Sequence, residues 1–143
     1  MSSSNPWLLL AAGLSAAAAL AHLAIILGGP RWYAFFGAGQ RMVRLAERGS
    51  PIATLITLGI AAVLTIWSVY ALSGAGVLPP VPLLRPGLVA ISAIYLIRAL
   101  VFVPVMSLRT GRASPFAWIS STIVLVFGLA YTVGTWTAWE SLQ

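Results

Sequence analysis

The stretch PIATLITLGIAAVLTIWSVYAL, residues 51–72, contains no charged side chain and is long enough to decide the fold class. A hydrocarbon core of about 30 Å is crossed by a helix of about 20 apolar residues. No water reaches the backbone at that depth, so every N–H and C=O group must be hydrogen-bonded within the protein. The stretch therefore predicts a transmembrane helix.

Three further apolar runs of similar length cover residues 7–27, 87–107 and 116–136. The first could be mistaken for a signal peptide, but residues 1–6 carry no basic side chain and the run is long for that role, so we expect a retained helix. Together the four runs predict an all-α integral membrane protein. We expect residues 1–143 to form a single domain, a four-helix bundle of up-down topology.

The composition of the whole chain agrees with this fold class. Of its 143 residues, 60% are hydrophobic and 7% are charged, and the mean hydropathy is +0.99. The formal charge of +6 comes from eight arginines against Glu47 and Glu140, which is too sparse for a nucleic-acid surface, so we expect no nucleic-acid partner. Cysteine is absent, which excludes disulfides and thiolate ligands. The residues identify no cofactor.

The arginines of the loops predict the orientation of the chain, because short cytoplasmic loops collect them. The loops at 28–50 and 108–115 together carry six arginines, whereas the loop at 73–86 carries one. The six are Arg31, Arg41, Arg44, Arg48, Arg109 and Arg112, and the single one is Arg85. We therefore expect the first and third loops in the cytoplasm and both termini outside it, as in a bacterial inner-membrane protein.

The first loop is patterned as an amphipathic helix. Its polar side chains recur at helical spacing, and its apolar ones fall elsewhere on the helical wheel. The polar set is Gln40, Arg41, Arg44, Glu47 and Arg48, and the apolar set is Met42, Leu45 and Ala46. The pattern predicts an interfacial helix entered through an aromatic, glycine-broken segment. Arg41, Arg44 and Glu47 form a candidate polar cluster, with a solvated face touching anionic lipid as the simpler interpretation.

Arg98 interrupts a stretch that is otherwise apolar from Pro86 to Leu108. An unpaired arginine near the midplane costs about 2.5–3.5 kcal/mol on insertion scales. Helical side chains lean toward the N-terminus, here the outer half, so we expect no easy reach to the cytoplasmic headgroups. Neither Glu47 nor Glu140 is expected at this depth. The predicted partner is therefore a ligand carboxylate, a phosphate or a lipid headgroup, with snorkelling to an interface as the alternative.

The candidate ligand site combines Arg98 with hydroxyl groups of neighbouring positions. Tyr95 lies three residues earlier on the same face, and Thr57, Thr65 and Thr132 belong to stripes of small and weakly polar residues on the second and fourth spans. Such stripes also serve as helix-packing surfaces without any ligand, which is the alternative for each of them.

His22, the only histidine, follows Ala11, Ser15 and Ala18 along one stripe of the first span. A histidine in a membrane helix can ligate a porphyrin metal or relay protons. No second ligand is identifiable in the sequence. We therefore favour a hydrogen bond across to a threonine of another helix, and a ligand histidine remains the alternative.

The arrangement of four spans with outward termini and a basic first loop resembles the membrane-associated eicosanoid and glutathione metabolism family. The stretch QRMVRLAERGSPIATL, residues 40–55, occupies the place of that family's Arg and Asn-x-x-Glu segment. Gly49, Ser50 and Pro51 stand where the Asn and Glu would be, so the resemblance implies an arrangement of helices and no activity.

Three functions remain open from the sequence. We favour a bundle that binds an anionic lipid or a small amphipathic ligand through Arg98, of transporter or carrier type as an oligomer. The alternatives are a non-catalytic subunit or assembly factor of a larger membrane complex, and a small enzyme acting on a lipophilic substrate. An enzyme is disfavoured because no nucleophile and base converge in the sequence. The expected partners are membrane lipids and either further copies of the chain or a larger complex.

Overall fold

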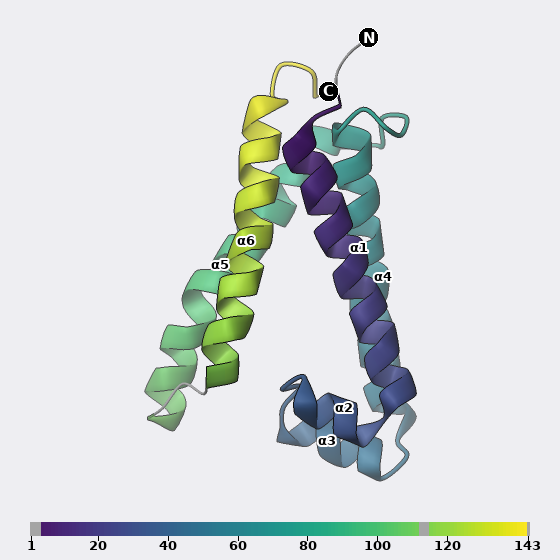
Figure 1. Cartoon of the computed structure of the whole chain (residues 1–143), viewed down its shortest axis with the longest axis vertical. Helices are drawn as coiled ribbons and strands as arrows, with labels where there is room; N and C mark the ends of the chain where they lie inside the picture. The colour runs from purple at the N-terminus through teal and green to yellow at the C-terminus, as the bar shows by residue number, and fades with distance from the viewer. Residues whose placement is uncertain (1–3, 112–114, 143) are drawn as a thin grey trace. The chain divides into compact units, whose positions relative to one another are not determined.

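The computed structural model describes residues 4–111 and 115–142, and all of the regular structure in this part of the chain is helical (Figure 1). Arg112, one of the six arginines used to predict the orientation, lies outside the described residues. The four long helices are α1 (Pro6–Gly28), α4 (Pro51–Gly74), α5 (Leu84–Thr110) and α6 (Pro115–Thr137), and the two short ones are α2 (Pro30–Phe35) and α3 (Gln40–Glu47).

Each of the four long helices is long and apolar enough to cross a membrane. They contain the four predicted runs, so the predicted all-α membrane fold is confirmed. Large aliphatic side chains such as Leu20 and Leu55 are about two-thirds exposed, at 66% and 65%. A soluble protein would bury such residues, whereas lipid tails are a suitable environment for them.

Prolines and glycines set the ends of the helices. Pro6, Pro30, Pro51 and Pro115 are the first residues of α1, α2, α4 and α6, a position at which the missing N–H has no partner to lose. Gly111 ends α5 in the left-handed region at φ 69°, which a side chain with a Cβ rarely adopts. The amphipathic helix expected in the first loop is α3, and the aromatic segment before it contains α2, which the sequence did not predict.

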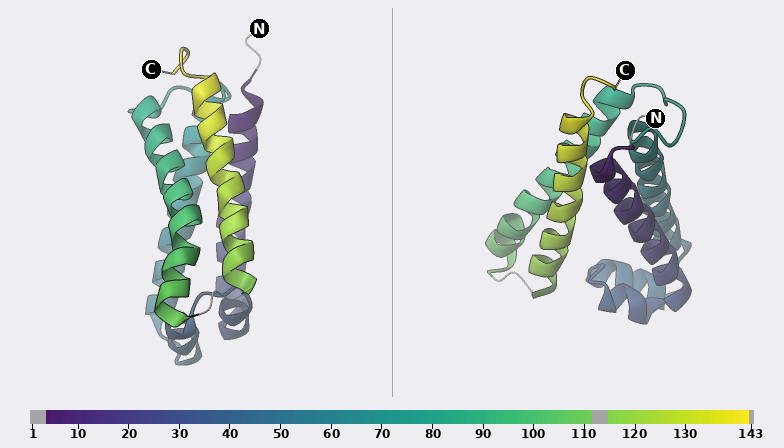
Figure 2. Two further views of the ribbon diagram at one scale, coloured as in Figure 1. Left: turned by 90° about the vertical axis from the view of Figure 1, so that its left-hand side faces the viewer. Right: turned by 45° about the horizontal axis from the view of Figure 1, so that its top comes forward.

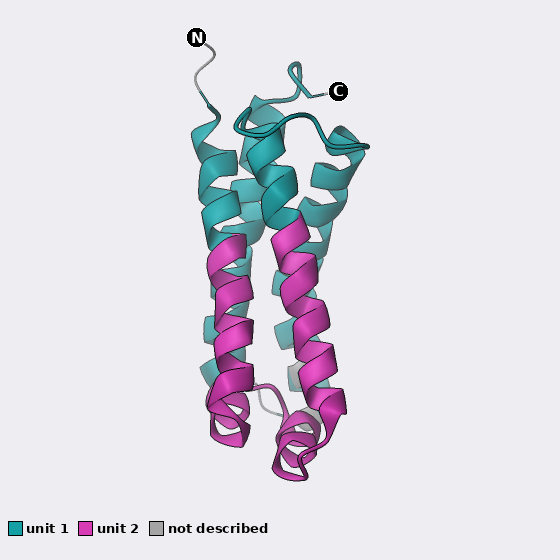
Figure 3. Ribbon diagram, turned by 90° about the vertical axis from the view of Figure 1, so that its right-hand side faces the viewer, with its two compact units in different colours: residues 1–14, 67–143 teal, residues 15–66 magenta. Residues whose placement is uncertain are grey.

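The chain divides into two compact units, each with a core of its own (Figure 3). Unit 1 comprises Met1–Leu14 and Trp67–Gln143, and unit 2 comprises Ser15–Ile66. Helices α1 and α4 therefore contribute residues to both units. The expectation of a single domain stays a prediction.

Unit 1 is built on α5 and α6, which lie side by side as an antiparallel hairpin (Figure 2). A cluster of aromatic rings fills its centre: the ring of Tyr95 lies 4.9 Å from that of Trp67, 5.5 Å from Phe127 and 5.3 Å from Tyr131, measured between centroids. The Tyr131 hydroxyl donates a 2.9 Å hydrogen bond to the carbonyl oxygen of Trp67, so the end of α4 is joined to α6.

Unit 2 places α2 and α3 against the adjoining parts of α1 and α4. Its buried cluster consists of Ile25, Tyr33 and Ala53, one residue each from α1, α2 and α4. The apolar side of α3 packs on this cluster through Met42, Val43, Leu45 and Ala46. The amphipathic pattern read in the sequence is therefore used to bury one side of α3.

Candidate functional site

Arg98 lies near the middle of α5, fourteen residues after Leu84 and twelve before Thr110. At a rise of 1.5 Å per residue, its Cα is about 20 Å from either end of the helix. The backbone of Arg98 is therefore far from both ends of α5. Its depth in a membrane stays a prediction.

The guanidinium of Arg98 has few partners. Its Nη2 donates to the hydroxyl of Ser120 on α6 over 3.5 Å, the long limit for such a bond. Its central carbon lies 3.7 Å from the centroid of the Phe102 ring, a cation–π contact. Nη1 is buried and has no hydrogen-bond partner among the residues that the structure describes. Nη1 is thus enclosed by protein, although its N–H groups donate to no acceptor among the described residues.

The direction of the Arg98 side chain differs from the expectation. Phe102 is one turn closer to the C-terminal end of α5, and Ser120 is in the second turn of α6, so the guanidinium points toward the end of the hairpin that carries Arg109. The Cα–Cβ bond leans the other way, but an arginine stem is long enough to turn back where an aromatic face and a hydroxyl attract its head. From Phe102 the end of α5 is about 12 Å away.

No acidic residue lies on α5 or α6. Glu140 follows the far end of α6, and the part of α6 from Ser120 to Thr137 alone spans about 25 Å. Glu47 is the last residue of α3 and belongs to unit 2. The hairpin itself therefore supplies no counter-charge for Arg98.

Tyr95 and Thr132, the other predicted site residues of unit 1, are used elsewhere. Tyr95 is buried in the aromatic cluster described above. Thr132 is exposed, and its hydroxyl donates 2.7 Å to the carbonyl of Gly128 in its own helix. Thr132 also lies twelve residues from Ser120 along α6, or about 18 Å. The structure thus brings Ser120 to Arg98, and it does not bring Thr132 there.

Thr57 and Thr65, the two predicted site residues on α4, belong to unit 2. Each hydroxyl donates 2.8 Å to a carbonyl of its own helix, Thr57 to Ala53 and Thr65 to Ala61. Their hydroxyl hydrogens are therefore occupied, and only the oxygen lone pairs remain for any other partner. Their role in a ligand site stays a prediction.

His22 makes its described hydrogen bond within α1. Its Nδ1 lies 2.7 Å from the carbonyl oxygen of Ala18, one turn earlier, instead of a threonine on another helix. The candidate polar cluster on α3 is also local: Arg41, Arg44 and Glu47 are all exposed, on the side of α3 away from its packed face. This exposure agrees with a solvated face.

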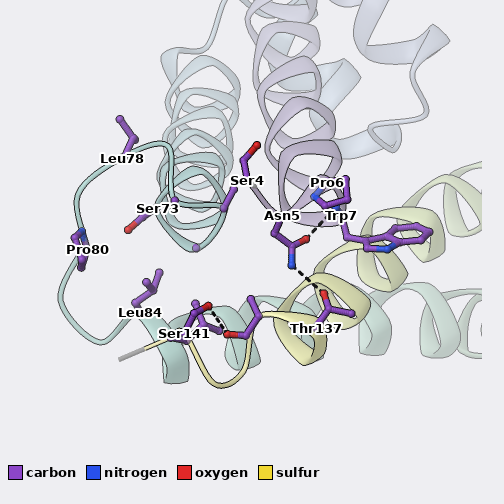
Figure 4. Close-up of a pocket in the computed structure, with 15 residues that line it drawn as sticks. Ser4, Asn5, Pro6, Trp7, Ser73, Leu78, Pro80, Leu84, Thr137 and Ser141 are labelled. Atoms are coloured by element: carbon purple, nitrogen blue, oxygen red, sulfur yellow. Dashed lines mark hydrogen bonds between the residues drawn. The ribbon is translucent and has the colours of Figure 1, made fainter. Parts of the chain in front are cut away.

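A cavity of about 800 Å³ in unit 1 lies among the ends of its helices (Figure 4). Most of its polar side chains are hydrogen-bonded to the chain itself, as two examples show. Asn5 accepts from the backbone N–H groups of Trp7 and Leu8 at 3.0 and 3.1 Å and donates 2.9 Å to Thr137. Ser73 donates 2.8 Å to the carbonyl of Pro79. These groups cap helices and hold loops in place, so the hydrogen bonds of this cavity are structural.

Neither Phe102 nor Ser120 was named from the sequence as a contact of Arg98. The contact with Phe102 could have been predicted, because Phe102 follows Arg98 by four residues and therefore lies on the same helix face one turn away. For Ser120 the sequence offers only the general expectation that a serine or threonine of the fourth span accepts from Arg98. Which one does so depends on how α6 is staggered against α5.

Among the described residues, no three His, Cys, Asp or Glu side chains lie close enough to hold a metal ion. The candidate site is thus a guanidinium between two apolar helices, in which Nη2 donates a hydrogen bond and Nη1 does not. No protein family model, curated protein or solved structure matches the chain.

Proposed function

We propose that this small polytopic membrane protein binds the anionic headgroup of a lipid through Arg98, on the α5–α6 hairpin. The observation that carries the proposal is the buried Nη1 of Arg98, which has no partner in the described part of the chain, on a hairpin without any acidic residue. Burying an unpaired guanidinium is costly, and a bound anion removes that cost.

An anion with several oxygen atoms, such as a phosphate, suits this guanidinium better than a monatomic anion would. The planar fork of arginine can donate two parallel hydrogen bonds to one phosphate or carboxylate. The guanidinium lies against the ring of Phe102, and the backbone of Phe102 is about 12 Å along the helix from the nearer end of α5. The headgroup of a lipid that sinks beside the hairpin can reach it. The carboxylate of a free amphipathic ligand offers the same chemistry, so the test includes both sources.

The orientation follows from the arginine count of the loops. We place the end of the hairpin that carries Arg109 in the cytoplasm and both termini outside it, in a bacterial inner membrane. The bound lipid then belongs to the cytoplasmic leaflet, which is the anionic one that basic side chains favour. Four spans are few for a secondary carrier, so any transport requires several copies of the chain.

Thermal unfolding of the purified protein in a neutral detergent tests the proposal. Added phosphatidylglycerol should raise the midpoint of the wild type far more than phosphatidylcholine does, since a ligand at a hundred times its Kd stabilises by about 2.7 kcal/mol. Arg98→Leu should lose this response, and Arg98→Lys should keep a reduced one because it lacks the planar fork.

Arg48→Leu is the matched control, because it removes the same charge from an exposed position at the end of α3. It should respond to phosphatidylglycerol as the wild type does. A response of the same size in Arg98→Leu would refute the proposal. A long-chain fatty acid that stabilises in place of phosphatidylglycerol would assign the site to a free carboxylate ligand.

A further inference from the structure

Unit 2 contains a separate cavity of about 210 Å³, lined by residues of α1, α2, α3 and α4 and of the segment between α2 and α3. Its apolar lining includes Phe36, Met42 and Ile56, and its polar lining consists of His22, Tyr33 and Thr57. None of these residues takes part in the contacts of Arg98.

The two hydroxyl groups of the cavity have no hydrogen left for a ligand. Thr57 donates its only hydroxyl hydrogen to the carbonyl of Ala53 over 2.8 Å. The Tyr33 hydroxyl lies 2.9 Å from the Thr57 oxygen, so it must be the donor of that bond. Toward the cavity, both oxygens can therefore only accept.

His22 is also an acceptor in its neutral form. A carbonyl oxygen only accepts, so the 2.7 Å contact with Ala18 requires the hydrogen of His22 to be on Nδ1. Nε2 then carries a lone pair, and it has no hydrogen-bond partner among the described residues. All three polar side chains of the cavity thus offer lone pairs, and none offers a hydrogen.

The geometry points to a binding site for a small phenolic ring, whose hydroxyl donates to Nε2 of His22. An apolar cavity of about 150 Å³ is enough to hold benzene, so 210 Å³ holds a ring with a small substituent. Phe36 and Met42 suit an aromatic face, through ring stacking and sulfur–aromatic contact. A ring that only accepts, such as a quinone or an aryl ether, leaves Nε2 unsatisfied.

Nitrogen-15 NMR of the protein labelled at histidine tests this site directly, because His22 is the only histidine in the chain. The full-length protein in lipid nanodiscs should show the tautomer with hydrogen on Nδ1. Added 4-fluorophenol should move the Nε2 resonance toward lower ppm, as a new hydrogen bond does, whereas 4-fluoroanisole should not. The opposite tautomer, or an Nε2 resonance unmoved by saturating 4-fluorophenol, would overturn the inference.

Fluorine NMR titrations of the same two probes measure the affinity, with empty nanodiscs as the background. The wild type should bind 4-fluorophenol about three- to tenfold more tightly than 4-fluoroanisole, the worth of one ordinary hydrogen bond. His22→Leu should abolish the preference. Tyr33→Phe should keep it, since the inference gives the ligand's hydrogen to His22; loss of the preference in Tyr33→Phe alone would assign the hydroxyl to Tyr33 and contradict the inference.

Discussion

At the scale of the residue, two arginines on α5 are accommodated in different ways. Arg85 donates through Nη2 to the carbonyls of Trp139, over 3.1 Å, and of Leu142, and it lies 4.7 Å from the centroid of the Trp139 ring. It therefore ties the segment after α6 to the start of α5. Arg98 has one long bond and one ring contact. Both arginines have one buried nitrogen without a partner among the described residues, Nε of Arg85 and Nη1 of Arg98. Arg85 is nevertheless held by two carbonyls, whereas Arg98 has a single long hydrogen bond and more capacity left to bind a ligand.

The two arginines should therefore respond oppositely to the same substitution in detergent without anionic lipid. Arg85→Leu should lower the free energy of unfolding by about 1–2 kcal/mol, because two carbonyls lose a charged donor. Arg98→Leu should leave it unchanged or raise it, because a buried and poorly paired charge disappears. Chemical unfolding of both variants beside the wild type measures this. A loss of stability in Arg98→Leu as large as that in Arg85→Leu would mean that Arg98 is a structural residue.

How much of the site could be predicted differs from residue to residue. Arg98 could be found in the sequence, because a charge inside an apolar run is conspicuous and costly. Its direction could not, because the stem reaches either way and the attraction of Phe102 and Ser120 decides. The threonines stay predicted ligand residues that can only accept, since a threonine in a membrane helix donates its hydroxyl hydrogen to the carbonyl one turn earlier, as Thr65 and Thr132 do.

At the scale of the element, unit 1 depends on the close approach of α6 to the start of α1. A Cβ added to Gly134 would lie 2.7 Å from Cγ and 3.0 Å from the backbone nitrogen of Leu8, which is fully buried. Small residues allow such contact between membrane helices, where lipid competes for larger apolar side chains. The absence of a side chain at Gly134 thus allows α6 to contact the start of α1 at Leu8.

Gly134→Ala should lower the stability of the protein by about 1–3 kcal/mol, because the new methyl group displaces Leu8 or separates the helices. Gly13→Ala is the matched control: it lies on α1 in the same unit, and a Cβ there meets nothing within 4 Å. The control should be neutral or stabilise by about 0.5 kcal/mol through helix propensity. Unfolding in a graded denaturant compares the two. Equal stability of both variants would contradict the described approach of α6 to Leu8.

The long elements were predictable, and the shortest was not. The four spans follow from hydropathy and length alone, since a membrane leaves the backbone few choices. Helix α3 was visible because its polar and apolar positions separate over eight residues. Helix α2 has six residues and lies among glycines, too short for a period to be read.

At the scale of the whole molecule, the leaflet from which Arg98 takes its lipid depends on which side of the membrane each loop lies. The chain contains no cysteine, so single-cysteine variants report one position each. Gln40→Cys at the start of α3 and Val77→Cys in the loop after α4 both replace exposed residues. In intact cells Val77→Cys should react with an impermeant maleimide, and Gln40→Cys should react only after the membrane is opened. The reverse pattern would invert the orientation and move the bound headgroup to the outer leaflet.

The central claim is that Arg98 holds an anionic lipid, and native mass spectrometry of protein extracted in gentle detergent tests it most directly. It reports the number of copies, any companion chain and the retained lipid in one spectrum. We expect wild type and Arg48→Leu to retain an anionic phospholipid, Arg98→Lys to retain less, and Arg98→Leu to retain none. Equal retention of anionic phospholipid by wild type and Arg98→Leu would contradict the account.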